Sequence, residues 1–251
     1  MAILQVSGLT KGYGGIRALD AVSISVGAGE AVGLIGPNGA GKTTLFDCIS
    51  GLIRPDAGTV EFDGQRIDNL PVYRRSRLGI GRTFQRIELF AGMTLHEHFL
   101  VAERQRRGDG RLWKDLLWKG APRPSELERV RLLTAELGLE ALASSPIEAL
   151  SLGQGRLVEL GRALITAPRL LLLDEPSSGL DARESAALAH VLNAVRQGRE
   201  LAVLVVEHDL DLVRAVSERA YALDTGRVIA EGPLIDVLQT ASVRAAYLGE
   251  S

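Results

Sequence analysis

The run GPNGAGKTT, at residues 36–44, has the residue types and spacing of a loop that holds phosphate groups. It fits the pattern Gly-x-x-x-x-Gly-Lys-Ser/Thr, follows the apolar run AVGLI (31–35) and opens the helix-like stretch TTLFDCIS (43–50). Glycines here let backbone N–H groups converge on phosphate oxygens at the positive end of a helix dipole. Lys42 would place a charge at the terminal phosphates, and the Thr43 hydroxyl would reach Mg²⁺. The predicted phosphate-binding residues are Gly36, Pro37, Asn38, Gly39, Ala40, Gly41, Lys42, Thr43 and Thr44.

Two further segments end apolar runs with groups that can handle a metal or a proton. LLLLDE (170–175) predicts a buried strand that ends in Asp174, a candidate Mg²⁺ ligand, and Glu175, a candidate general base for an attacking water. VVEHDL (205–210) places His208 after the next buried strand. Because neighbouring parallel strands end at the same edge of a sheet, we expect His208 to lie near Glu175. Each motif alone could be an ordinary solvated loop, but together with the phosphate loop they predict a phosphoryl-transfer site.

The elements that must position these groups change character along the chain. ILQV (3–6), VSISV (22–26) and TVEF (59–62) predict strands joined by short turns, which indicates a partly antiparallel sheet. Residues 170–174 and 201–207 are continuous apolar runs, as in strands buried on both faces. Between them, residues 182–198 have helical spacing and reach a stop at Gly198, which completes a β-α-β unit of a parallel sheet.

Residues from about 94 to 167 predict helices and contain no convincing strand, so we interpret them as a helical insert in an α/β core. Ser125 and Glu128 have the spacing of a capping box at the start of one of these helices. The basic stretch 103–126 holds both tryptophans. Its apolar face, with Leu112 and Trp113, is expected to pack on the chain's own helices, with contact to a membrane protein or lipid as the alternative.

Composition limits the classes of function. A chain of 251 residues suits one large α/β domain, and its net charge of −2 disfavours nucleic acid as a partner. The apolar runs are too short to span a bilayer, and no signal peptide is expected at the start of the chain. Cys48, the single cysteine, excludes an intramolecular disulfide, fits a reducing compartment and is interpreted as a small buried apolar residue.

The motifs GPNGAGKTT, LSLGQGR, LLLLDEPSSGLD and EHD, in this order and at this spacing, resemble the ATP-binding subunit of an ABC transporter. The resemblance covers essentially the whole chain. It implies a P-loop NTPase core with a mixed parallel sheet, an antiparallel β subdomain and a helical subdomain, in one ABC ATPase domain over residues 1–251. The expected divisions are a core at about 1–93 and 168–235, a helical subdomain at about 94–167 and a helical tail at about 236–251.

The resemblance also implies roles for residues that the pattern alone would leave as core or surface positions. Tyr13 matches the aromatic residue that stacks on adenine, and Gln85 matches the glutamine that reaches the metal and the attacking water. Asp181 matches the loop that couples two facing sites. The cofactors implied are ATP and Mg²⁺, and the implied activity is ATP hydrolysis coupled to transmembrane transport.

The run LSLGQGR (150–156) looks like a second phosphate-facing loop that lacks a lysine. By the resemblance it faces the phosphate loop of a second ABC subunit in a head-to-tail dimer, so that Ser151, Gly153 and Gln154 serve the partner's ATP. Leu152 stands where glycine is the commonest residue, and Gly155 where a polar residue is more usual. The contacting positions are kept, so activity is still expected.

A narrower resemblance, carried by GIGRTFQRIELFAGMTLHEHFLVA, VEHDLDLV and AAYLGE, is to the branched-chain amino acid importers of bacteria. It implies a cytoplasmic subunit, peripheral on the inner face of the cell membrane, that drives inner-membrane permease subunits and serves a solute-binding protein indirectly. Urea, other amino acids and lipid or lipopolysaccharide export are alternatives within the family. The solute, and whether the dimer partner is a copy or a paralogue, are not set by these motifs.

Three other classes of protein share parts of the pattern. A P-loop kinase of small metabolites would need an acceptor pocket and an arginine-bearing lid, and would not need LSLGQ or His208. Non-transport ABC proteins of translation carry two cassettes, and those of DNA repair carry long coiled coils or zinc-binding cysteines, whereas this chain has one cassette and one cysteine. A switch that senses ATP without cleaving it is disfavoured by Glu175.

Overall fold

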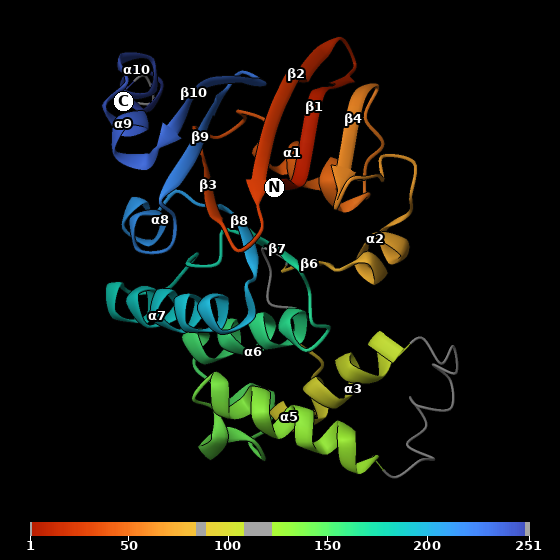
Figure 1. Cartoon of the computed structure of the whole chain (residues 1–251). Coiled ribbons are helices and arrows are strands. Elements are labelled where there is room, and N and C mark those ends of the chain that lie inside the picture. The colour runs from red at the N-terminus through yellow and green to blue at the C-terminus, as the bar shows by residue number, and fades with distance from the viewer. Residues whose placement is uncertain (1, 84–88, 108–121, 249–251) are drawn as a thin grey trace.

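A six-stranded sheet forms the centre of the molecule in the computed structural model, which describes residues 2–83, 89–107 and 122–248 (Figure 1). Its strand order is β10-β9-β3-β8-β7-β6, and all neighbouring pairs are parallel except β9 and β10. Every residue of β3, β7 and β8 is buried, which explains why their sequences are continuous apolar runs. The strands are β3 (Ala31–Ile35), β6 (Ile80–Arg82), β7 (Leu170–Asp174), β8 (Ala202–Val206), β9 (Arg219–Asp224) and β10 (Arg227–Pro233).

A second, antiparallel sheet covers one side of this core (Figure 1). Its order is β2-β1-β4-β5, and its inward side chains join those of α1 and of the central sheet in one hydrophobic cluster. The helix α1 therefore packs between the two sheets, and Gly51 ends it in a left-handed conformation with φ 87°. The elements are β1 (Ala2–Tyr13), β2 (Ile16–Gly27), α1 (Lys42–Ser50), β4 (Ala57–Phe62) and β5 (Gln65–Arg66).

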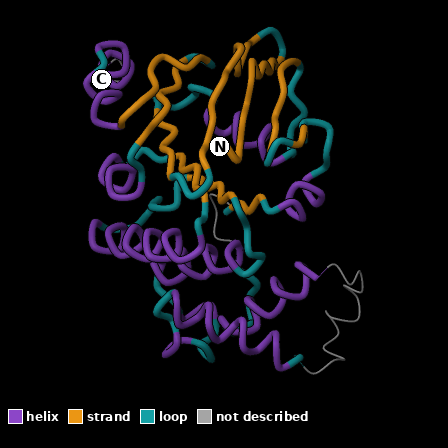
Figure 2. Tube along the Cα trace, viewed as in Figure 1, coloured by secondary structure: helices purple, strands orange, loops and turns teal. Residues whose placement is uncertain are grey.

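Helices cover the other face of the central sheet, below the strands in the view of Figure 2. The side chains of β7 separate the two layers. Leu170 and Leu172 pack with α1 in the first cluster, whereas Leu171 and Leu173 pack with α6 and α7 in the second. Consequently α1 and α6 lie on opposite faces of one sheet. The helices on this side are α3 (Leu95–Arg107), α5 (Pro124–Glu136), α6 (Leu152–Leu164) and α7 (Ala182–Arg199), with 3₁₀ turns at Glu140–Leu142 and Ile147–Ala149.

The C-terminal helices form a third cluster against β9 and β10 at one side of the molecule (Figure 1). No helix within the described ranges combines the length and apolar character needed to cross a bilayer. The remaining helices are α2 (Val72–Leu78), α8 (Leu210–Val216), α9 (Leu234–Gln239) and α10 (Ala241–Leu248).

The predicted elements are largely present, with two local corrections. The expected capping box at Ser125 and Glu128 is wrong: α5 begins at Pro124, whose fixed φ favours the first helical position, and Glu126 accepts a hydrogen bond from the Arg123 N–H at 2.9 Å. The stop expected at Gly198 lies two residues later, where Glu200 takes a left-handed conformation. The apolar face proposed at Leu112 and Trp113 lies outside the described residues.

Candidate nucleotide and catalytic site

The loop between β3 and α1 needs glycine for steric reasons. Gly36 has φ 146°, and a Cβ placed there would lie 2.0 Å from the carbonyl oxygen of Leu223. Gly41 has φ 104°, and its Cβ would lie 2.3 Å from the carbonyl oxygen of Ala18. Two backbone segments therefore approach the loop too closely for any side chain, which explains the glycine at each end.

Lys42 is the first residue of α1 and is buried, and its ammonium group folds back over the loop that precedes it. Its Nζ donates to the carbonyl oxygen of Pro37 at 2.8 Å and to that of Gly36. The charged ammonium group of Lys42 thus lies against backbone carbonyl groups of the phosphate loop. Asn38, Gly39 and Thr43 are exposed, Pro37 and Thr44 are partly buried, and Ala40 is buried.

The tips of β7 and β8 bring two of the predicted groups together. His208 Nε2 lies 3.1 Å from Glu175 Oε1, as expected from neighbouring parallel strands. Glu175 has φ 48°, a conformation that costs free energy for a residue other than glycine, and its N–H donates to the carbonyl of Val206 at 2.9 Å. Both side chains are partly exposed, so a ligand can reach them.

Glu207 ties the two loops that carry this pair. Its buried carboxylate accepts hydrogen bonds from the backbone N–H and from the hydroxyl of Ser177, both at 2.7 Å, and from the N–H of His208 at 3.0 Å. The segments after Glu175 and before His208 are therefore joined through one carboxylate. Glu207 was not predicted from the sequence, although its place beside His208 in the EHD motif was a usable signal.

Asp174 is 2% exposed, and burial raises the pKa of its carboxyl group while the neighbouring Arg82 opposes that shift. Arg82 Nη2 lies 3.0 Å from Asp174 Oδ2, and Asp174 Oδ1 is a buried atom with no hydrogen-bond partner in the described part of the chain. An orphaned carboxylate oxygen of this kind suits a magnesium ion or its bound water. Among the described residues no group of three or more His, Cys, Asp and Glu could hold a metal ion alone.

The loop that begins α6 is held by its own side chains. Ser151 is the N-cap, and its Oγ accepts from the Gln154 N–H at 3.2 Å, while Gln154 Oε1 accepts from the Ser151 N–H at 2.9 Å. Gly153 lies close to α7, where an added Cβ would sit 2.9 Å from Glu184 Oε1. This capping box fixes the loop's shape, and 43% of the Leu152 side chain is exposed beside it.

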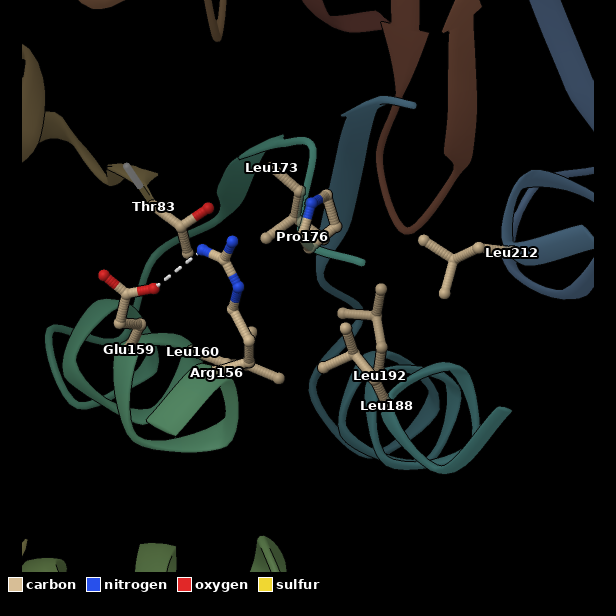
Figure 3. Close-up of a pocket in the computed structure, with 9 residues that line it drawn as sticks. All are labelled: Thr83, Arg156, Glu159, Leu160, Leu173, Pro176, Leu188, Leu192 and Leu212. Carbon is tan, nitrogen blue, oxygen red and sulfur yellow. Dashed lines mark hydrogen bonds and ion pairs between the residues drawn. The ribbon is translucent and has the colours of Figure 1, made fainter. Parts of the chain in front are cut away.

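The start of α6 is also connected to the loop that follows Glu175. Arg156 Nη1 pairs with Glu159 at 3.2 Å, and Nη2 donates to the carbonyl of Ser178 at 3.0 Å. Figure 3 shows this pair beside Thr83 and Pro176, in a small cavity whose other wall consists of leucines from α7 and α8. The start of α6 is thus joined to the backbone three residues after the predicted general base, Glu175.

The sequence profile described as ABC transporter matches residues 19–178. The chain belongs to the ABC transporter family. It is 37% identical, over 99% of its length and 98% of the relative's, to the high-affinity branched-chain amino acid transport ATP-binding protein BraF of Pseudomonas aeruginosa. It is also 36% identical, over 100% and 98%, to the lipopolysaccharide export system ATP-binding protein LptB of Escherichia coli.

Solved structures confirm the predicted fold class of this ABC transporter chain. A crystal structure of the ADP conformation of an ATP-binding cassette is similar with a TM-score of 0.89 and 33% identity, and covers 99% of both chains. A dimeric structure of a bacterial ABC transporter cassette is similar with a TM-score of 0.76 and 28% identity, over 92% of this chain and 98% of the other.

The remaining predicted site residues of this ABC transporter chain differ in their exposure and in their contacts. Tyr13 ends β1 with 46% of its surface exposed, and Lys11 Nζ lies over its ring, 5.5 Å from the centroid. Asp181 caps α7, and its Oδ1 accepts from the N–H groups of Arg183 and Glu184, each at 2.8 Å. Gln85 lies outside the described residues.

Two more residues at the site, besides Glu207, were not found from the sequence. Arg82 joins α1 to the tip of β7, and its place in RTFQ, three residues before Gln85, was the available signal. Tyr247 in α10 accepts a hydrogen bond from the N–H of Gly36 at 2.8 Å, so the end of the chain touches the first glycine of the phosphate loop. No motif pointed to that contact.

Proposed function

We propose that this chain binds MgATP, pairs with a second ABC subunit and hydrolyses the nucleotide to energise transport through a membrane permease. One observation carries the proposal. A phosphate loop with a buried lysine lies on the sheet whose neighbouring strand tips hold Glu175 and His208 at 3.1 Å. The P-loop kinase alternative gives no reason for the paired loop at Ser151 or for this histidine.

In this proposal the loop amides from Gly36 to Thr44 and the ammonium of Lys42 bind the phosphates. Asp174 and Thr43, with Gln85, would hold Mg²⁺, which neutralises phosphate charge when bound. Glu175 accepts the proton of the attacking water, and His208 fixes the direction of the Glu175 carboxylate through their hydrogen bond. Tyr13 supplies a stacking surface for the base, where such contacts contribute about 1–3 kcal/mol.

The position of α6 supports a site shared between two chains. Because α1 and α6 pack on opposite faces of the central sheet, Ser151 at the start of α6 does not share the layer of its own phosphate loop. A bacterial ABC transporter cassette similar to this chain is dimeric. If the two subunits are arranged head to tail, Ser151, Gly153 and Gln154 reach the partner's nucleotide and Asp181 lies at the dimer boundary. A copy of this chain and a paralogue both satisfy this arrangement.

The surface for the permease is assigned to a groove of about 260 Å³ beside β6. It is lined by Arg82 and Thr83, just before Gln85, and by residues of α2 and α6. The apolar side chains of Leu52, Val72 and Tyr73 are exposed nearby. We assign the chain to the cytoplasmic face of the inner membrane, with a solute-binding protein acting through the permease.

For the cargo, we propose branched-chain or related amino acids, supported by BraF and by the RTFQ, EHD and AYLGE segments. LptB, at nearly the same identity, makes lipopolysaccharide export the second candidate. We further propose a division of the chain into three parts. The core consists of residues 1–93 and 168–235, the helical subdomain of residues 94–167 and the tail of residues 236–251.

The test has two stages. The purified chain should hydrolyse ATP, and Lys42→Ala should lose tight MgATP binding; equal binding by both proteins would refute the site. Expression of the chain in a Pseudomonas aeruginosa strain that lacks BraF should then restore uptake of labelled leucine. Restoration of lipopolysaccharide export in a strain depleted of LptB, without leucine uptake, would instead favour the second candidate.

A further inference from the structure

Arg82 occupies a central position between the phosphate-loop helix and the predicted metal ligand. It ends β6 with 13% of its side chain exposed. Nη1 donates to Asp47 Oδ1 at 2.6 Å and to Ser50 Oγ at 3.0 Å, both on α1, while Nη2 donates to Asp174 Oδ2 at 3.0 Å. A single guanidinium thus bridges α1 and the tip of β7.

Because of this contact, the two oxygens of the Asp174 carboxylate have different surroundings. Oδ2 is bonded to the guanidinium, whereas Oδ1 is buried with no hydrogen-bond partner among the described residues. A buried carboxylate needs a cation nearby, because transfer of an unpaired charge from water into a protein interior is costly. In the unliganded chain, Arg82 supplies that cation. When the nucleotide is bound, Mg²⁺ would supply a cation at the same place.

We propose that Arg82 is a positioning residue that weakens Mg²⁺ binding at Asp174. This inference rests on the proposed MgATP site. The guanidinium, bonded to Oδ2, repels a second cation that approaches Oδ1 of the same carboxylate. An arginine cannot lose its proton to relieve that repulsion.

Removal of the Arg82 charge should therefore have opposite effects on the stability of the unliganded protein and on its affinity for Mg²⁺. The unliganded protein should become less stable, because Asp174 and Asp47 lose their shared partner. The complex with ADP should bind Mg²⁺ more tightly, by about tenfold, the low end of the effect of one neighbouring charge on an ionisable site. A residue that merely held the metal site in shape would give weaker Mg²⁺ binding when removed.

The experiment compares neutral and charged substitutions. Calorimetry would titrate MgCl₂ into protein saturated with ADP, after subtraction of a titration into ADP alone, and thermal unfolding would be recorded without nucleotide. Arg82→Met and Arg82→Gln should both bind Mg²⁺ more tightly, and the glutamine can still donate hydrogen bonds if the methionine variant does not fold. Arg82→Lys should stay near the parent, since it keeps the charge.

Arg131→Met is the matched control, because Arg131 forms an exposed pair with Glu128 on α5, away from the site. It should leave Mg²⁺ affinity unchanged. Unchanged or weaker Mg²⁺ binding in both neutral variants overturns the role of Arg82, provided that they bind ADP in EDTA as the parent does. Failure of the parent itself to bind ADP would instead overturn the proposed nucleotide site.

Discussion

His208 Nε2 and Glu175 Oε1 lie 3.1 Å apart, although 33 positions separate the two residues in the sequence. Each follows the end of a buried strand, and the strands are parallel neighbours. The backbone of Glu175 is held in a left-handed conformation by its bond to Val206, and its carboxylate is directed by the contact with His208. Such a fixed direction is useful for a general base, whose efficiency depends on geometry first.

Replacement of Glu175 by glutamine tests this assignment. Glu175→Gln keeps the shape of the side chain but removes the base, so ATP hydrolysis should fall by about 10²–10⁴-fold while ATP binding persists. Uncleaved ATP should then trap a dimer that light scattering detects. Glu128→Gln, an exposed change on α5, is the control. Normal turnover by the Glu175→Gln protein would show that another group activates the water.

The sequence predicted what local patterns determine. The phosphate loop, its flanking elements β3 and α1, and the β7-α7-β8 unit follow from short motifs and from runs whose hydrophobicity reflects burial on both faces. The meeting of Glu175 and His208 was also predictable, because parallel neighbours end at one edge. The start of α5 was missed because Pro124, one residue before the assumed cap, determines where the helix begins.

Contacts between distant residues could not be predicted in the same way. Arg82 and Asp174 are 92 positions apart, and Gly36 and Tyr247 are 211 apart. Neither pair has a spacing that a motif encodes, since each depends on how three layers pack. Ser151 and Gln154 illustrate a related limit: the motif suggested contact with a nucleotide, whereas the structure adds a capping box that serves the helix itself.

Tyr247 gives a test of the contact between the C-terminal helix and the phosphate loop. Tyr247→Phe keeps the ring in its apolar cluster but leaves the buried Gly36 N–H without this acceptor. An unsatisfied buried donor costs about 1–3 kcal/mol, so the free energy of unfolding should fall by that amount. Tyr73→Phe, at a ring that is 56% exposed, should have no measurable effect. Equal unfolding curves for the two variants would show that the hydroxyl contributes nothing.

Two helical glycines should respond in opposite ways to alanine. A Cβ at Gly161 in α6 would lie 2.4 Å from Phe99 Cζ and 2.7 Å from Leu137 Cδ1, so Gly161→Ala should destabilise the chain by about 1–3 kcal/mol. Gly198 in α7 has nothing within 4 Å of such an atom. Gly198→Ala should stabilise the chain by about 0.4–1 kcal/mol, because alanine restricts the unfolded chain. Urea midpoints of the two variants provide the comparison, and a shift in the same direction would contradict it.

Cys48 should be chemically inert in the folded protein. It is fully buried in α1, and burial raises the pKa of its thiol to about 11. The thiolate is the reactive form, so a disulfide reagent at pH 8 should label the native chain far more slowly than the chain in guanidinium chloride. Between pH 9 and 11 the unfolded thiol releases a proton that the folded one keeps. Stability should consequently fall as the pH rises through that range. Equal labelling rates for native and unfolded protein would contradict the buried position.

The shared site predicts that two inactive variants can restore each other. Lys42→Ala removes the charge of the phosphate loop, and Ser151→Arg adds bulk to the loop at the start of α6, so each alone should lose hydrolysis. The experiment requires that the chain pairs with itself, which light scattering of the Glu175→Gln protein with ATP establishes. In a mixed head-to-tail dimer both lesions fall in one composite site, and the other site is intact.

Mixing should therefore return part of the parent's ATPase rate. Half of the dimers in an equal mixture would be mixed, and each would carry one working site, so about one quarter of the parent rate is the upper expectation for independent sites and random pairing. A mixture of Lys42→Ala with Lys42→Ala/Ser151→Arg is the control. It should stay inactive, because both proteins lack Lys42 and no dimer contains an intact phosphate loop. If Ser151 served the phosphate loop of its own chain, each variant would spoil its own site, and the Lys42→Ala and Ser151→Arg mixture would stay as inactive as the control.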